Sequence, residues 1–467
     1  MVQSRDASSI GSYGPGVAGS VARAAPRIKR AVNGPLGRRI ALGGAAVAAV
    51  AAVVLLVALP SGTRQTRPSV TAPPSPRVFV PPTGIPHDCS ADVGTLLRSW
   101  LWSLPRGTPA SPLVVDFPAN SCYLVNESLY LRGFTNTTLN GRHATFRQAA
   151  PTVQSIGPLP TVSPYCGSDI DKESGTTIST VPIIWWFEGG CDITITNMVI
   201  IGPNASGVVG SQNDSGIQLS GVQRAVIDGV TINNVDGDFV TLSGLHEAAN
   251  SGSSFPTTDA TIKGNSFSRS GRQGITPEYV DHVSITHNFV RGVAASVIDL
   301  EADSTGGCAC NVKVDRNTFA GLASYLVAGI TGLSIRHFDF THNRLVDGAQ
   351  LKIQLAPQLP SSDVVISGNS GSTGSTWPWP SVGIAYWTGG DSAGPLVGVQ
   401  VSGNSIPAPS GGRPFVRVGK QASNVGVSHN VISQGNQSTT LLNDGGASNH
   451  ACSNRARVGG PAFDGPC

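Results

Sequence analysis

Charged side chains are scarce in this sequence, because Lys, Arg, Asp and Glu together make up only 13% of its 467 residues. The formal net charge is +3, and several of the basic residues lie before residue 40, so the rest of the chain is close to neutral. Proteins that bind nucleic acid gather basic residues on one face. We therefore expect no nucleic-acid partner.

Metal-binding cysteine motifs are also missing. The eight cysteines show no C-x-x-C pair and no Cys/His spacing typical of zinc sites. Their even number, beyond a hydrophobic segment, indicates disulfides formed in an oxidising compartment. Cys308 and Cys310 are too close in sequence to be paired by this reasoning. Near neighbours are the favoured pairs: Cys166 with Cys191, and Cys452 with Cys467.

Glycine is abundant where charge is scarce, at 57 of 467 residues, and Val, Ile and Thr recur in short runs. This composition favours β-structure with many tight turns over helices. The length permits one large domain or two ordinary ones.

One long hydrophobic run stands near the N-terminus. Residues 40–59 carry no charge, and twenty residues of helix match a hydrocarbon core roughly 30 Å thick. Basic residues are denser before this run than after it, which predicts a cytoplasmic N-terminus. We expect a cytoplasmic tail over 1–39 and a transmembrane signal-anchor over 40–60. The alternative is a cleaved export signal, for which Arg38 and Arg39 favour the twin-arginine type, and cleavage would release a secreted protein.

The segment 61–86 is rich in Pro, Ser and Thr and predicts an extended linker. Beyond it a phrase recurs seven times, as in VSITHNFV and VGVSHNVI. Its asparagines follow one another at steps of 23, 29, 26, 26, 35 and 26 residues, and a second β-like run lies between copies. Such a period is typical of a solenoid in which each repeat forms one coil. The repeated residues are Asn265, Asn288, Asn317, Asn343, Asn369, Asn404 and Asn430.

A leucine-rich repeat is the rival solenoid. Val and Ile stand where it needs Leu, and no segment between copies shows helical periodicity. The asparagines are expected to be structural, because Asn tolerates the left-handed turn conformation and its amide bonds to neighbouring coils. Apolar residues spaced as one helical face over 93–104 predict a helix that covers the first coil.

The predicted cap helix followed by LVVDFPANSCYLVNESLYLRGFTNTTLNGRHATF resembles the opening coils of the pectate-lyase superfamily of right-handed parallel β-helices. The resemblance extends over about 88–435. The stretch SGRQGITPEYVDHVSITHNFV, followed by SVIDLEAD, is similar to the pattern R-x-G-I then G-I-D-I-E of β-helix proteins that act on sugars. Ser296 and Val297 replace its small residue and Gly, and Ala302 its Pro.

The paired-aspartate motifs of polygalacturonases and the D-P-H signature of mannuronan epimerases are missing. The resemblance therefore implies an all-β right-handed parallel β-helix and a carbohydrate substrate, without a named activity. We expect the β-helix domain over 87–435 and a C-terminal tail or cap over 436–467.

Alternation along the predicted strands separates inward from outward side chains. If Ile298 and Leu300 face the core, Asp299 and Glu301 face outward. Two carboxylates so placed repel each other unless a proton, a cation or a nearby Lys offsets their charge. We therefore expect Asp299 and Glu301 to be catalytic or to bind Ca²⁺, with Lys352 as a further catalytic candidate.

Other outward or loop positions supply candidate substrate-binding residues. Arg272 either pairs with a substrate carboxylate or ties down a loop. Asp236 and Asp238, in NVDGDFV, are assigned to turn formation. The ring of Trp387 suits stacking on a sugar as well as packing on the solenoid. The predicted substrate-binding residues are Arg272, Glu278, Gln354, Trp387 and Arg417.

These features predict a membrane-anchored, extracytoplasmic protein that acts on an acidic polysaccharide. Elimination needs a base beside the sugar C5 and a cation at the uronate, for which Lys352 and Ca²⁺ are candidates. Hydrolysis needs paired carboxyl groups, one of them protonated. The sequence leaves these mechanisms open. The alternative is a non-catalytic carbohydrate-binding or adhesin-like surface protein.

Overall fold

The described residues all belong to the second of the two units into which the chain divides, 71–467. The computed structural model describes residues 75–156, 178–180, 183–204, 210, 214–246, 254–301, 307–321, 323–330, 334–373, 380–386, 394–409, 413–433, 441–443, 447–456, 464 and 466–467. The predicted membrane anchor over 40–60 lies outside these residues. Within them, no helix is long and apolar enough to cross a membrane. The anchor and its orientation stay predictions.

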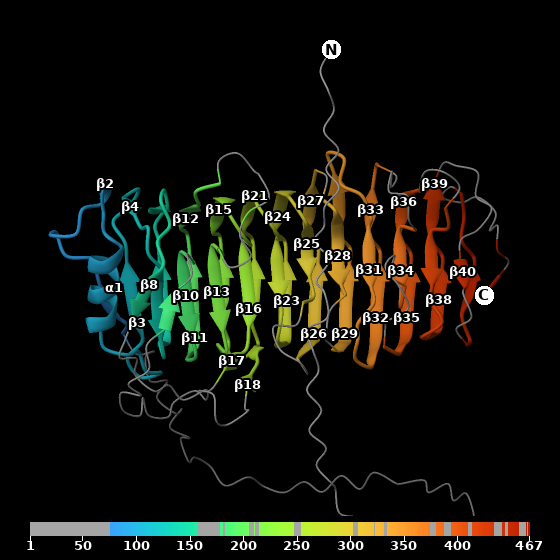
Figure 1. The fold of residues 1–467 in the computed structure, drawn as a ribbon, viewed down its shortest axis with the longest axis horizontal. Coiled ribbons are helices and arrows are strands. Elements are labelled where there is room, and N and C mark those ends of the chain that lie inside the picture. Colours follow the sequence, from blue (N-terminus) through green and yellow to red (C-terminus); the bar gives the residue numbers. More distant parts are fainter. Residues whose placement is uncertain are drawn as a thin grey trace, which may run out of the picture. The chain divides into compact units, whose positions relative to one another are not determined.

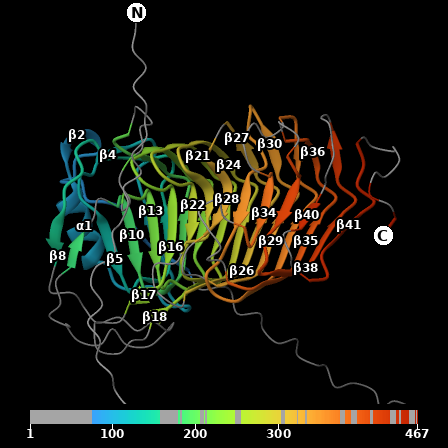
Figure 2. The same cartoon turned by 45° about the vertical axis from the view of Figure 1, so that its right-hand side comes forward.

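Three parallel sheets form the described solenoid, and successive strands of the chain pass from one sheet to the next (Figure 1). Each sheet pairs a strand with its counterpart one coil later, and Figure 2 shows these strands side by side along the axis. This is the predicted parallel β-helix.

The first sheet has 14 strands. In order they are β1 (Arg77–Phe79), β3 (Leu113–Asp116), β6 (Thr135–Asn140), β11 (Cys191–Thr196), β14 (Val226–Asp228), β20 (Thr261–Lys263), β23 (Val280–Thr286), β26 (Cys308–Asp315), β29 (Ser334–Thr341), β32 (Ser361–Ser367), β35 (Leu396–Ser402), β38 (Ala422–Ser428) and β41 (His450–Cys452), with β19 (Thr257–Thr258) beside β23.

The second sheet has 12 strands. They are β2 (Asp88–Asp92), β4 (Cys122–Leu124), β7 (Thr145–Arg147), β12 (Val199–Ile201), β15 (Thr231–Val235), β21 (Ser266–Ser270), β24 (Phe289–Val293), β27 (Thr318–Ala320), β30 (Arg344–Val346), β33 (Ser370–Gly371), β36 (Ser405–Pro407) and β39 (Val431–Ser433).

The third sheet, called the site sheet below, has 11 strands. They are β5 (Leu129–Arg132), β10 (Trp185–Glu188), β13 (Ile217–Ser220), β16 (Val240–Ser243), β22 (Ile275–Pro277), β25 (Ser296–Asp299), β28 (Tyr325–Gly329), β31 (Ile353–Leu355), β34 (Val382–Ile384), β37 (Val416–Val418) and β40 (Leu441–Asn443). Two antiparallel pairs stand apart from the sheets: β8 (Gln154–Ile156) with β9 (Ile178–Thr180), and β17 (Leu245–His246) with β18 (Ser254–Phe255).

Strand β1 pairs with β3, and strands β40 and β41 follow residue 435, so the coils extend beyond the predicted bounds of 87–435 at both ends. The predicted pair Cys452–Cys467 is a disulfide, and Cys308–Cys310 and Cys89–Cys122 are bonded too. Cys191 is disulfide-bonded, whereas Cys166 lies outside the described residues.

The cap helix α1 (Gly94–Ser103) lies at the N-terminal end of the solenoid, within the range that the apolar pattern predicted (Figure 1). Leu97 and Leu101 are fully buried, and the Trp102 indole donates a hydrogen bond of 2.6 Å to the backbone of Tyr130. Leu96 was expected on the same face but is 54% exposed.

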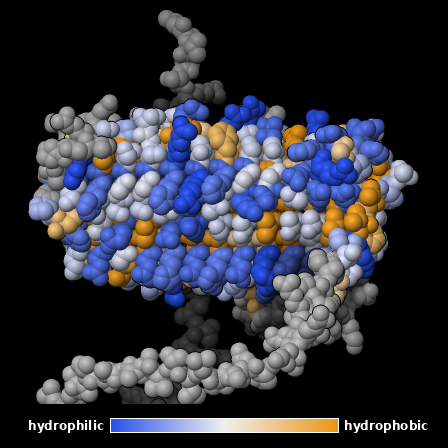
Figure 3. Space-filling view, turned by 180° about the vertical axis from the view of Figure 1, so that it is seen from behind, coloured by the Kyte–Doolittle hydropathy of each residue, from blue (hydrophilic) through white to orange (hydrophobic). Residues whose placement is uncertain are grey.

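The surface seen from behind carries hydrophilic and intermediate residues in rows along the solenoid (Figure 3). Hydrophobic residues gather near its N-terminal end, at the right of that view. Among the described residues, four of the five exposed large hydrophobic side chains belong to the first coils: Val78, Val80, Leu96 and Val153.

The repeated asparagines form a continuous buried ladder. Each amide oxygen accepts hydrogen bonds from the asparagine one coil earlier, as Asn343 does from the backbone and side-chain nitrogens of Asn317 at 2.9 and 3.1 Å. The ladder continues through Asn454. The expected left-handed conformation belongs to the preceding residue instead, for example His342 with φ 52°. The asparagine therefore supplies the amide that joins the coils, and the residue before it adopts the left-handed turn conformation.

Replacing Asn343 by Ala is expected to lower the free energy of unfolding by several kcal/mol. The amide also donates to the carbonyl of Val314 at 2.9 Å, and each buried group left without a partner costs roughly 1–3 kcal/mol. Denaturant unfolding measures the loss, and Gln400→Ala, at an exposed position of β35, is the matched control. Equal stability of the two variants would contradict a structural role for the ladder.

Candidate active site

The predicted inward and outward pattern of β25 is present. Ile298 and Leu300 are fully buried in the core, so Asp299 lies on the opposite, outer face of the strand. Asp299 is nevertheless only 8% exposed, which makes it a buried carboxyl rather than a solvated surface group. Glu301 follows it on the same side and retains a partly exposed side chain.

Arg272 lies in the turn between β21 and β22 and joins two carboxylates. Its Nη2 donates to Glu301 Oε2 at 2.6 Å, and its Nη1 donates to Asp238 Oδ2 at 3.2 Å. The guanidinium therefore ties the chain before β16 to the chain after β25. Of the two roles that the sequence left open for Arg272, these contacts match the tying of chain segments.

Gln273 connects Asp299 to these residues. The group is called the Asp299 cluster below, and its members are Asp238, Arg272, Gln273, Thr276, Asp299 and Glu301. Its side-chain nitrogen donates to Asp299 Oδ2 and, at 3.4 Å, to Glu301 Oε2. Its side-chain oxygen accepts a hydrogen bond of 2.9 Å from Thr276, whose hydroxyl also lies 2.7 Å from Asp238 Oδ2. The Gln273 amide thus contacts both carboxyl groups that were predicted to be catalytic, those of Asp299 and Glu301.

Asp238 was assigned to a tight turn, and this interpretation was incomplete. Its side chain is almost fully buried and accepts bonds from Arg272, Thr276 and, at 3.1 Å, the backbone nitrogen of Gln273. Sequence reasoning also missed Gln273 and Thr276. The available signal was the coil register: Val240 pairs with Ile275, which places Gln273 one coil after Asp238.

The carboxyl groups of this cluster differ in their electrostatics. Burial, together with the charges of Glu301 and Asp238, raises the pKa of Asp299 to about 8 against the opposing charge of Arg272. Burial also raises the pKa of Asp238, against the opposing charge of Arg272. Asp299 therefore holds a proton at neutral pH, whereas Glu301 forms an ion pair with Arg272.

The other predicted residues occupy different places on the site sheet. Glu278 directly follows β22 and is partly buried. Gln354 of β31 lies two coils beyond Asp299 and is only 2% exposed. Lys352 lies two coils beyond β25, roughly 10 Å along the axis. Its ammonium donates to the carbonyl of Ala323 at 3.3 Å, and burial lowers its pKa.

Arg417 lies four coils beyond β25, roughly 20 Å along the axis. Its guanidinium stacks 4.0 Å from the ring centre of Tyr386, and its Nη1 donates to the Tyr386 hydroxyl at 2.9 Å. It is therefore separate from the Asp299 cluster. Trp387 lies outside the described residues.

No group of three or more His, Cys, Asp or Glu side chains in the described part of the chain has the arrangement of a metal site. Ca²⁺ prefers several oxygen ligands. At Asp299 and Glu301 the carboxylate oxygens accept bonds from nitrogen donors of Gln273 and Arg272, which a cation there would displace. Calcium binding stays a prediction.

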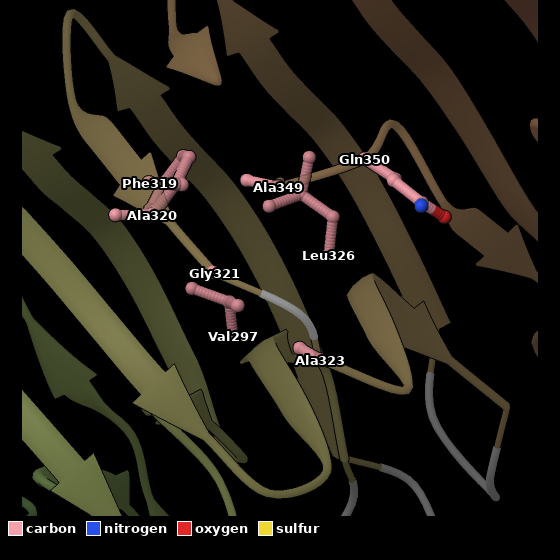
Figure 4. A pocket seen from close by; sticks show the side chains of 8 residues that line it. All are labelled: Val297, Phe319, Ala320, Gly321, Ala323, Leu326, Ala349 and Gln350. Carbon is pink, nitrogen blue, oxygen red and sulfur yellow. The ribbon is translucent and has the colours of Figure 1, made fainter. Parts of the chain in front are cut away.

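A small pocket is lined in part by Val297 of β25, two residues before Asp299. Figure 4 shows its lining from β25, β27 and β28, from the turn between β27 and β28, and from the turn between β30 and β31. The lining side chains are apolar apart from the Gln350 amide, and the cavity volume is about 10 Å³. Its residues are Val297, Phe319, Ala320, Gly321, Ala323, Leu326, Ala349 and Gln350.

A second buried carboxyl lies on the N-terminal coils of the site sheet. Glu188 accepts a hydrogen bond from the Tyr130 hydroxyl and lies 3.5 Å from Arg132 Nε. Trp186 packs edge-on against Tyr130 with 4.9 Å between ring centres. Burial raises the pKa of Glu188 to about 7.

Replacing Glu188 by Gln is expected to flatten the pH dependence of stability. With a folded-state pKa of about 7 against 4.5 for an ordinary Glu, the folded protein retains a proton that the unfolded chain loses. Its contribution to stability is full below pH 4.5 and is lost as the pH rises towards 7, with a slope of at most about 1.4 kcal/mol per pH unit. Denaturant unfolding between pH 4 and 8 measures this, and parallel curves for the two proteins would contradict it.

No family model and no curated protein match this chain. Among solved structures it is similar to a family 28 exopolygalacturonase of Yersinia enterocolitica, with a TM-score of 0.50 and 13% identity over 80% of this chain and 78% of that one. It is also similar to an α-1,3-glucanase catalytic unit of Streptomyces thermodiastaticus (TM-score 0.47, 12% identity, 79% and 66% coverage). A third is the tailspike protein of E. coli bacteriophage HK620 in complex with a pentasaccharide (TM-score 0.45, 12% identity, 78% and 63% coverage). The first likeness establishes the fold as a right-handed parallel β-helix.

Proposed function

Starting from a right-handed parallel β-helix, we propose that the protein hydrolyses glycosidic bonds of a polysaccharide at the Asp299 cluster. The observation that carries this proposal is that two neighbouring carboxyl groups, Asp299 and Glu301, differ in protonation. Asp299 is buried with a pKa raised to about 8, and Glu301 is paired with Arg272. Glycoside hydrolysis requires one protonated and one ionised carboxyl group.

In the proposed reaction, the Asp299 carboxyl group donates its proton to the glycosidic oxygen. The bond from that oxygen to the sugar C1 breaks, and the leaving sugar departs as an alcohol with the bonding electron pair. The Glu301 carboxylate attacks C1 and forms a covalent glycosyl ester. Water, deprotonated by the Asp299 carboxylate, then releases the sugar and restores both groups.

A retaining outcome is supported by the Gln273 amide. One nitrogen contacts an oxygen of each carboxylate, so the two groups lie closer than the roughly 6.5–9.5 Å separation of an inverting pair. Arg272 and Gln273 act as positioning residues, because they hold Glu301 and Asp299 in place.

Hydrolysis is favoured over elimination because the side chains of Arg272 and Lys352 already make contacts within the protein. Arg272 is shared between Asp238 and Glu301, and the Lys352 ammonium lies at the Ala323 carbonyl. Neutralising a uronate with either group would break an existing contact. Action on an acidic polymer, membrane anchoring and an extracytoplasmic location complete the proposal as predictions from sequence. Ca²⁺ at Asp299 and Glu301 belongs to the alternative elimination mechanism.

The test is a screen of the purified full-length protein in detergent against neutral and uronate-containing polysaccharides. Reducing ends report hydrolysis, absorbance near the unsaturated-product band reports elimination, and parallel reactions contain chelator. Proton NMR of the first product formed reports the anomer. We expect new reducing ends, retained configuration and no unsaturated product. Unsaturated product that chelator abolishes would establish the lyase instead, and binding without product would establish the carbohydrate-binding alternative.

A further inference from the structure

We infer that the Cys308–Cys310 disulfide is a redox-active site, which takes a dithiol and oxidises it to a disulfide. The two cysteines belong to β26 of the first sheet, whereas Asp299 belongs to the site sheet. The inference therefore goes beyond the proposed hydrolysis and does not depend on it.

The bond does little for the fold. It joins residues only two apart in sequence, whereas the Cys452–Cys467 disulfide joins residues 15 apart and the Cys89–Cys122 disulfide residues 33 apart. The stabilisation by a disulfide grows with the length of chain that it closes. Strand β26 is moreover paired along most of its length with β23 on one side and with β29 on the other. The sheet therefore holds these residues whether the bond is open or closed.

The bond lies on the outer face of β26. Ala309, between the two cysteines, is fully buried, so the side chains of Cys308 and Cys310 point away from the core. Both cysteines are partly exposed. Thiol–disulfide exchange requires that a thiolate reach one of the two sulfurs. This face of the strand permits that approach.

A cation lies beside the bond. Arg336 pairs with Cys310 on the next coil, and Ser334 pairs with Cys308. Ile335 is fully buried, so Arg336 projects from the same outer face as the cysteines. Its Nε donates to Ser334 Oγ at 3.1 Å, so the side chain runs back along β29 beside the disulfide. A neighbouring cation stabilises a thiolate and makes it a better leaving group. Cys310, opposite Arg336, is therefore the sulfur that leaves.

The other charged groups beside the bond already have partners. Asp281 pairs with the same cysteine from the preceding coil, and its carboxylate opposes the effect of Arg336. Its Oδ1 accepts a hydrogen bond of 2.6 Å from Asn311 and lies 3.0 Å from His282 Nδ1, and these contacts offset part of its charge. His337 is exposed and lies 3.6 Å from a carboxylate of the next coil. Arg336 remains the charge that favours a thiolate.

The exchange takes place in two steps. A thiolate of the dithiol attacks Cys308 Sγ, the S–S bond breaks, and its electron pair goes to Cys310 Sγ, which leaves a mixed disulfide between the dithiol and Cys308. The second thiolate of the dithiol then attacks its partner sulfur in this mixed disulfide and displaces the Cys308 thiolate. The dithiol loses two electrons and departs as a disulfide. Its two protons pass to water, and the two cysteines take up two protons from water.

The first test equilibrates the full-length protein with graded ratios of reduced to oxidised dithiothreitol, a small dithiol. Alkylation traps the free thiols, and peptide mass mapping locates them. Cys308–Cys310 should be half open at a ratio on the order of tenfold lower than Cys89–Cys122, whose cysteines are also partly exposed but close a longer loop. Opening of the two bonds at the same ratio would overturn the inference.

The second test uses the double variant Cys308→Ser/Cys310→Ser. The oxidised wild-type protein should convert a peptide that contains two thiols to its disulfide form, and the double variant should not. The double variant should melt close to the wild-type temperature, because the sheet holds β26 on both sides. Equal oxidation of the peptide by the two proteins, or a large fall in the melting temperature of the variant, would show that the bond is structural.

The third test replaces Arg336 by Met. The rate of exchange at pH 7 should fall roughly three- to tenfold, and alkylation of Cys310 in the reduced protein should shift to higher pH, because its thiolate loses the neighbouring cation. Arg344→Met, at an exposed position of β30, is the matched control. A wild-type rate and pH profile for Arg336→Met would contradict the assignment of Cys310 as the leaving sulfur.

Discussion

Replacing Asp299 by Asn is expected to lower the rate of glycoside hydrolysis by about 10²–10⁴-fold, the usual contribution of a general acid. The amide cannot donate a proton to the leaving oxygen. The shape of the side chain and its contact with Gln273 are otherwise retained, so the variant should fold. Initial rates on the polymer and the far-ultraviolet circular dichroism spectrum measure the two effects. Asp228→Asn, on the first sheet, is the matched control.

The same substitution should change the pH dependence of stability. Burial raises the pKa of Asp299 from 3.8 to about 8, so the folded protein holds a proton that the unfolded chain releases. The contribution of this group to stability is full below pH 3.8 and is lost as the pH rises through 8. Asn removes this loss, so the variant should be more stable than the wild type above pH 8.

Full catalytic activity of Asp299→Asn would contradict the first prediction and show that another residue is the general acid.

Replacing Arg272 by Met is expected to destabilise the protein by about 3–5 kcal/mol, the usual cost of removing one partner from a buried ion pair. Asp238 is 1% exposed and Glu301 is partly buried, and both would lose their counter-charge. Arg272→Lys should recover only part of the loss, because one ammonium cannot reproduce the two directed contacts of the guanidinium.

Denaturant unfolding at pH 7 measures this loss, with Arg291→Met, at an exposed position of β24, as the control. The loss should shrink as the pH falls, because protonated carboxyl groups no longer need the guanidinium. A stability equal to that of the wild type at pH 7 would show that Arg272 is not part of a buried network.

The repeat was sufficient to predict the coils, because the period of two within each strand and the recurring asparagine follow directly from the solenoid geometry. The inward positions of Ile298 and Leu300 were predicted for this reason. The burial of the outward-facing Asp299 side chain was not predicted, because alternation gives the direction of a side chain and not what covers it. Because Asp299 is buried, its substitution is expected to change stability as well as activity.

The Asp299 cluster was not predicted because its members come from different coils. Asp238 and Gln273 are 35 residues apart, and Gln273 and Asp299 are 26 apart, so no local motif contains them. Aligning the sequence by coil would have placed Asp238 and Gln273 together, because the pairing of Val240 with Ile275 fixes their register. The bridge from Arg272 to Glu301 also depends on side-chain conformations, which the register alone does not determine.

The asparagine ladder also bears on how such a protein changes length in evolution. Asn317, Asn343 and Asn369 are separated by equal steps of 26 residues, and within the ladder each side chain bonds to the asparagines one coil before and one coil after it. Duplication of one such segment would preserve every amide contact on both sides of the insertion and lengthen the outer face by roughly 5 Å. The number of sugars that one molecule spans can thus grow by unequal crossing-over in the gene, without a new fold and without moving Asp299.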